Sequence, residues 1–254
     1  MDYDDDFRPY VSAAQRKLRA QRAAQRLARK GGSHAPVVIS GTAIAKTFWG
    51  SSWCRNIEGY ADFRSRLERG RSYVRTGAVV DLALAPGVVS ARVMGSRLYE
   101  VEVKIEPLPK ARWDALCARC SGAIDSLVEL LQGRFSHAVM EHICERDTGL
   151  FPRQREITFT CTCPDWAVMC KHVAAVLYGI GARLDEAPQL IFALRKVDEE
   201  ALIAGAGSDL RMADRGGRAR RLENANLSEL FGIDVAGAKT VARGKGTRRR
   251  AGSK

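Results

Sequence analysis

Several features that would indicate common classes of protein are missing from this sequence of 254 residues. Its longest apolar stretch, residues 173–182, is far shorter than the roughly 20 residues of a membrane-spanning helix. Residues 1–6 are acidic, whereas a secretory signal begins with basic residues followed by an apolar segment. The sequence has neither a Gly-x4-Gly-Lys-Ser/Thr phosphate loop nor the His-x-Glu motif of zinc deaminases. We therefore expect a cytoplasmic protein with no membrane contact, no P-loop ATPase activity and no deaminase activity.

The central part of the chain also has little net charge. Residues 1–30 contain eight basic and four acidic side chains, and residues 236–254 contain seven basic and no acidic ones, so the two ends account for nearly all of the net charge of +12. Basic tails can bind nucleic-acid phosphates and release counterions, or they can simply be solvated and disordered. For the C-terminal tail we name three candidate nucleic-acid contacts, Arg248, Arg249 and Arg250.

Cysteine and histidine are sparse, yet four of them are concentrated in one window of twelve residues. Three cysteines and one histidine form a Cys-x-Cys pair, a six-residue spacer and a Cys-x-His pair: Cys161, Cys163, Cys170 and His172. Four such donors satisfy the tetrahedral shell of a structural zinc ion. The alternatives are buried free thiols and disulfides, but a disulfide within the first pair would be strained. The pattern predicts one Zn2+ bound by these four residues.

The residues around this window predict how the backbone carries the donors. The segment 156–160 alternates apolar and polar residues, as in a half-buried strand, and the residues after His172 have helical spacing. Pro164 and Asp165 favour a turn between the two pairs. We therefore expect a small module in which zinc joins the end of a strand to the start of a helix.

The ligand pattern resembles the SWIM zinc finger, a domain named for Swi/Snf-type ATPases and Mutator-type transposases. Small bacterial SWIM proteins also tend to have an aromatic-Trp-Gly element and an Arg-Gly-Arg-x-Tyr element, which residues 48–50 and 69–73 match. The resemblance covers about residues 46–205. It implies a metal-stabilised module that binds DNA or proteins, and it implies a Swi/Snf-type ATPase as a possible partner.

The overall fold class that we predict is α+β, with an antiparallel three-strand meander, helices and the zinc module. The strands are expected near 80–84, 89–93 and 99–105 because apolar residues alternate there. Helices are expected at 12–30 and 53–67 and within 109–147. The predicted organisation is a basic tail and linker at 1–45, an α+β domain at 46–150, the zinc finger with its following helices at 151–205 and a basic tail at 206–254.

A second metal site is an alternative to simple packing in the middle of the chain. Cys117 and Cys120 form a Cys-x2-Cys pair that could combine with His142 and Cys144. The same residues lie on apolar helical faces, so core packing also explains them.

Few residues in the central part of the chain, between the two basic tails, could contact nucleic acid. We name Lys171, beside the zinc ligands, and Arg69, Arg71 and Arg75, which surround Tyr73 in a predicted loop. Guanidinium groups bind phosphate and an aromatic ring can stack on a base. The alternative is a solvated loop beside a core tyrosine.

A catalytic zinc keeps one coordination position open, whereas this motif supplies four protein donors. We therefore predict a non-enzymatic zinc module that binds DNA or RNA, a protein partner, or both, with no small-molecule substrate. The alternative is a protein-interaction adaptor that does not bind nucleic acid.

Overall fold

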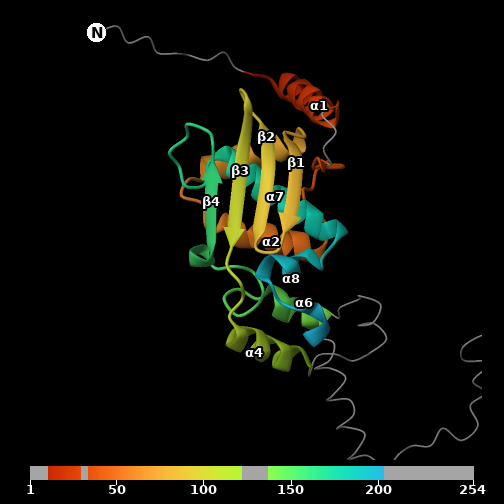
Figure 1. Cartoon of the computed structure of the whole chain (residues 1–254), viewed down its shortest axis with the longest axis vertical. Coiled ribbons are helices and arrows are strands. Elements are labelled where there is room, and N and C mark those ends of the chain that lie inside the picture. The colour runs from red at the N-terminus through yellow and green to blue at the C-terminus, as the bar shows by residue number, and fades with distance from the viewer. Residues whose placement is uncertain (1–10, 30–33, 122–136, 203–254) are drawn as a thin grey trace, which may run out of the picture. The chain divides into compact units, whose positions relative to one another are not determined.

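The computed structural model describes residues 11–29, 34–121 and 137–202 of the protein (Figure 1). At its centre is an antiparallel sheet with the strand order β1-β2-β3-β4. The predicted three-strand meander is confirmed, and a fourth strand from the predicted zinc module extends it beyond β3. The strands are β1 (Val79–Ala85), β2 (Val88–Met94), β3 (Leu98–Ile105) and β4 (Ile157–Cys161).

One face of the sheet is buried, as the alternating sequence predicts. In β2 the side chains of Val89, Ala91 and Val93 are buried, while those of Ser90 and Arg92 are exposed. A half-buried antiparallel sheet produces this alternation because successive side chains point to opposite faces. The buried face packs against helix α7 (Lys171–Glu186), which lies behind the sheet in Figure 1.

Helix α7 is the central helix of the fold. Eleven of its sixteen residues are buried, because α2 (Phe48–Glu58), α3 (Arg64–Arg75) and the sheet all pack against it. A helix that is apolar on nearly every side is stable in water only inside a core. The indole nitrogen of Trp53 in α2 donates a hydrogen bond of 2.8 Å to the carbonyl oxygen of Leu177, which joins α2 to the middle of α7.

The predictions for residues 53–75 were partly wrong. Instead of one helix over 53–67, the chain forms α2, breaks at 59–63 and forms α3, so Arg69, Arg71 and Arg75 are helical rather than in a loop. Gly70, in the middle of this predicted loop, is a buried residue of α3 where α3 and α7 approach closely. A Cβ atom at Gly70 would lie 2.5 Å from the Cβ atom of Ala174.

The remaining helices are α1 (Ala13–Arg29), α4 (Lys110–Ser121), α6 (His137–Cys144) and α8 (Leu190–Arg195). Before β1, in the predicted linker, the amide of Val37 and the carbonyl of Ala35 form hydrogen bonds with that strand. The fold is α+β, as predicted. Within the described ranges, no helix combines the length and the apolar character that crossing a membrane requires. The C-terminal tail, including Arg248, Arg249 and Arg250, lies outside the described residues.

Candidate metal centre

The first pair of predicted ligands lies where β4 ends. Cys161 pairs with Val101 of β3, and the amide of Thr162 donates a 3.0 Å hydrogen bond to the carbonyl of Glu100. The Thr162 hydroxyl also accepts a 3.0 Å bond from the Glu100 amide. These two bonds hold Thr162 against β3 where β4 ends and the chain bends, and the sulfurs of Cys161 and Cys163 both belong to one cluster of donors.

The second pair of ligands lies at the start of α7. Cys170 is the N-cap residue, and its sulfur accepts a hydrogen bond of 3.5 Å from the amide of Val173. His172 lies in the first turn and is buried. The positive end of the helix therefore faces the cysteine cluster, where it favours thiolates.

The four side chains meet at one point. The metal-binding atoms of Cys161, Cys163, Cys170 and His172 all lie within 4.8 Å of one another. The Nδ1 atom of His172 is 3.9 Å from the sulfur of Cys161 and 4.0 Å from that of Cys170. Two donors on a tetrahedral zinc ion, at about 2.3 Å for sulfur and about 2.1 Å for nitrogen, are about 3.6 Å apart. The cluster thus needs only a small contraction to hold zinc.

The ionisation of the three thiols also suits a metal. A hydrogen bond from Cys161 lowers the pKa of Cys170 to about 4 despite burial, and His172 and the Val173 amide add to this effect. The same hydrogen bond, together with burial, raises the pKa of Cys161, and burial raises that of Cys163. The thiolate is the form that binds metal, so the lowered pKa of Cys170 favours binding, and zinc would displace the protons that remain on the cluster.

Aromatic rings fix the histidine. The ring of His172 lies 4.5 Å from that of Tyr99, at a tilt of 30°, and 5.4 Å from that of Tyr73, edge to face. Its Nε2 atom is buried without a hydrogen-bond partner in the described structure, next to Gly95, where a Cβ atom would come within 2.8 Å. Because Nδ1 faces the sulfurs while Nε2 faces away, the imidazole is held in the orientation that metal binding through Nδ1 requires.

Residues 155–179 match the SWIM zinc finger family. This segment contains all four clustered donors, so the resemblance inferred from the sequence is confirmed there. The chain is also similar to the uncharacterized protein Rv2102 of Mycobacterium tuberculosis (strain ATCC 25618 / H37Rv), with 34% identity over 165 residues. The match covers 64% of this chain and 59% of that protein, so the chain spans less than two thirds of its relative. The comparison with solved structures finds no match.

The SWIM segment borders a basic cleft. The cleft has a volume of about 760 Å³ and lies between α1, α3, the β2–β3 turn and the start of α7. Its cations are Arg16, Arg19, Arg69 and Lys171. Its one acidic residue, Asp165, is paired with Arg66 at 3.1 Å. The cleft therefore favours an anionic ligand, and it has the candidate zinc ligand His172 in its wall.

Of the four predicted nucleic-acid contacts in the central part of the chain, two line the cleft and two do not. Arg69 and Lys171 both line the cleft, although they are far apart in the sequence. Arg71 points elsewhere: its guanidinium pairs with Glu58 and lies 5.3 Å from the ring centre of Tyr178 in α7. Arg75 is exposed but lies outside the cleft lining.

Sequence reasoning missed the contribution of α1. Arg16 lies 6.0 Å from the ring centre of Tyr73 and donates a 3.3 Å hydrogen bond to the hydroxyl of Ser72, so α1 is attached beside the cleft. Four exposed arginines follow at spacings of three and four, which places them on one helical face: Arg19, Arg22, Arg26 and Arg29. With Arg97 they line a second hollow of about 730 Å³. We call these five residues the arginine stripe.

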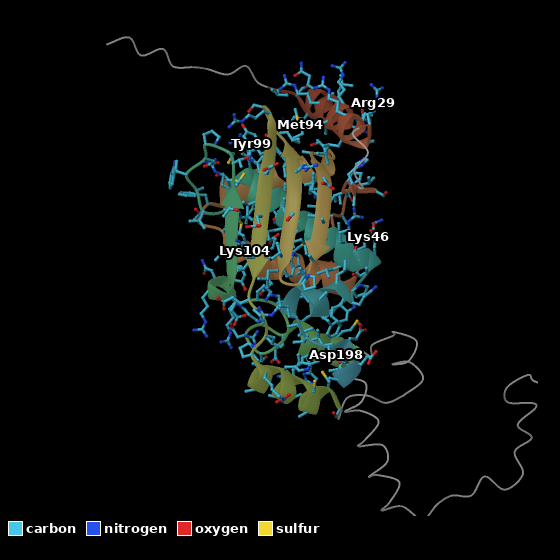
Figure 2. The ribbon with its side chains drawn as sticks, viewed as in Figure 1. Arg29, Lys46, Met94, Tyr99, Lys104 and Asp198 are labelled. Atoms are coloured by element: carbon cyan, nitrogen blue, oxygen red, sulfur yellow. The ribbon has the colours of Figure 1, made fainter. Side chains whose placement is uncertain are left out.

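The arginine stripe and the cleft share Arg19 and Ser96, so the two surfaces are continuous. Figure 2 places Arg29, Met94 and Tyr99 at the same end of the sheet, with Lys104 toward its other end and Asp198 beyond that end. No residue of the stripe forms an ion pair with another described residue. The sequence shows the spacing of these arginines, but it does not show that α1 packs beside the cleft.

The alternative second metal site has no support from the described residues. Among them, the SWIM cluster is the one group of cysteine, histidine or acidic side chains that could hold an ion. Cys120 is buried in the core, and Cys117 and Cys144 pack against it. Burial raises the pKa of Cys144 to about 12, which disfavours the thiolate that a metal requires.

Proposed function

We propose that this protein binds one zinc ion through Cys161, Cys163, Cys170 and His172 and uses the adjacent basic surface to bind nucleic acid, DNA foremost. The zinc has a structural role, because four protein donors leave no coordination position for a reacting water. It would hold the end of β4 against the start of α7 and so fix Lys171 in the cleft. The protein then acts as a non-enzymatic module.

The observation that carries the nucleic-acid proposal is the convergence of cations from three separate parts of the chain. Arg16 and Arg19 come from α1, Arg69 comes from α3 and Lys171 comes from α7. Among the residues that the structure describes, none of these four cations forms an ion pair with an acidic side chain. A polyanionic backbone can contact all of them at once. Contacts of this kind fix position on the backbone and do not read sequence.

The test measures affinity for a fluorescent DNA oligonucleotide as a function of salt. The double variant Arg69→Glu/Lys171→Glu is expected to bind at least about tenfold more weakly than wild type, because it replaces two cleft cations with repulsive charges. Arg75→Glu is the matched control, since Arg75 is exposed on the same helix but lies outside the cleft. Equal losses in both variants would contradict the role of the cleft.

The protein-interaction adaptor stays the second proposal, with a Swi/Snf-type ATPase as the partner that the family resemblance implies. It predicts no binding of DNA or RNA even at low salt, and co-purification with the ATPase that does not depend on the two cleft residues. The same salt series therefore separates the two proposals.

A further inference from the structure

The loop between the two pairs of zinc ligands exposes a tryptophan. Trp166 is 80% exposed, whereas the other three tryptophans, Trp49, Trp53 and Trp113, are at most 8% exposed. Exposing a large aromatic ring to water is unfavourable, and tryptophans at such positions are common where a ring or an apolar group of a ligand packs on them.

The backbone that carries Trp166 is fixed. The carboxylate of Asp62 accepts hydrogen bonds from the amides of Val168 and Met169, at 3.0 and 3.3 Å. Asp165 accepts a 3.3 Å bond from the amide of Ala167 and is itself paired with Arg66. A loop with these restraints loses little conformational entropy when a ligand binds, which favours affinity.

The tryptophan ring is also oriented. Phe63, the residue before α3, contacts it edge to face, with the ring centres 5.3 Å apart and the planes at 83°. The two residues directly before Trp166 in the sequence, Pro164 and Asp165, line the basic cleft. A ring that can accept stacking therefore lies beside a surface that can accept phosphates.

We infer that the preferred ligand is single-stranded nucleic acid, with a base stacked on Trp166 and the neighbouring phosphates in the cleft. This inference rests on the proposed nucleic-acid function and deepens it. In a duplex, each base face is covered by the next base pair, so a ring can stack on a base only after the duplex is unstacked at a cost of a few kcal/mol per step. An unpaired base has free faces, and stacking on an aromatic ring is worth about 1–3 kcal/mol per base.

The experiment compares a single-stranded oligonucleotide with the duplex of the same sequence, using fluorescence polarisation at one salt concentration. Trp166→Ala is expected to weaken single-strand binding by about 5- to 150-fold, the stacking energy expressed as an affinity ratio, and to leave duplex binding unchanged. Trp166→Phe should restore most of the loss because it retains a ring. Val168→Ala is the matched control, since Val168 is an exposed apolar residue of the same loop. An RNA strand of the same sequence tests whether the affinity depends on the sugar.

Intrinsic fluorescence gives a second readout, because Trp166 is the one exposed tryptophan of the chain. Single strands should quench it and duplexes should not. Equal affinity for both forms, with no effect of Trp166→Ala, would overturn this inference and leave the cleft proposal intact. Wild-type affinity of Trp166→Ala for the single strand, together with weaker binding of the Arg69→Glu/Lys171→Glu variant, would do the same. If neither oligonucleotide binds or quenches the Trp166 fluorescence, the nucleic-acid proposal itself fails. The exposed ring would then be explained by contact with a protein partner.

Discussion

Helices α1 and α7 are almost equal in length, yet they are attached to the fold in opposite ways. Helix α7 has eleven buried residues, whereas α1 has one, Ala20. Helix α7 carries two candidate zinc ligands and sets the position of the cleft, while α1 contributes exposed arginines to the rim. The buried α7 thus fixes the candidate zinc site and Lys171 in the core, whereas four of the five arginines of the stripe are on a helix with one buried residue.

The largest effect that we expect comes from breaking the metal centre at the start of α7. Cys161→Ser or His172→Ala should reduce zinc content from one ion per chain to almost none and unfold the segment 161–172. Metal binding contributes about 10–16 kcal/mol in zinc-finger peptides, so the thermal midpoint should fall clearly even though the core remains. Metal analysis and thermal unfolding test this. The control is Cys117→Ser, a half-buried cysteine of α4, which should retain zinc.

The next largest effect should come from the contact between α3 and α7. In Gly70→Ala, the added methyl group would overlap Ala174, so we expect the free energy of unfolding to fall by about 1–3 kcal/mol. Ser65→Ala, at an exposed position of α3, is the control and should be neutral or slightly stabilising. Chemical denaturation measures both. Equal stability of Gly70→Ala and wild type would show that the two helices can separate without cost.

For α1 the expected change is in binding rather than stability. Replacing Arg19, Arg22 and Arg26 by Gln removes three cations of the stripe, and the salt dependence of nucleic-acid affinity should become less steep. The slope of log K against log salt should change by about 2 to 3, given about 0.7 to 0.9 per neutralised phosphate. Lys104→Gln, at an exposed position of β3, should leave the slope unchanged. A stripe that contributes nothing would give the wild-type slope.

The smallest effect should come from loosening the attachment of α1. Arg16→Ala removes the contact with Tyr73 and the hydrogen bond to Ser72, a loss of about 0.5–1 kcal/mol at a partly exposed site. Amide hydrogen exchange should become faster in α1 and stay the same in α7. Lys17→Ala, at an exposed position of α1, is the control. Faster exchange in both helices would contradict the independence of α1.

The parts of this structure that could be predicted are those that depend on local sequence. The alternation of apolar residues in β1–β3 and the short spacing of the four candidate zinc donors are both visible in local sequence, and the structure confirms the strands and brings the donors together. The pairing of β4 with β3 could not be predicted, because it joins residues 52 to 60 positions apart in the sequence through backbone hydrogen bonds that leave no sequence pattern.

The errors around Gly70 have a different physical cause. Glycine favours loops when its backbone freedom is used, but it also occurs where two helices must approach closely. The sequence alone does not distinguish these two uses. The same limit applies to Tyr73, which contacts both His172 and Arg16: its role depends on tertiary neighbours from α7 and α1.

The capping role of Cys170 links the metal to the stability of α7. The Cys170 sulfur accepts the Val173 amide and also belongs to the ligand cluster, so one atom serves both the start of the helix and the metal. Loss of the metal and fraying of the first turn of α7 should therefore occur together. The helix that packs against the whole buried face of the sheet would then lose its order from this end.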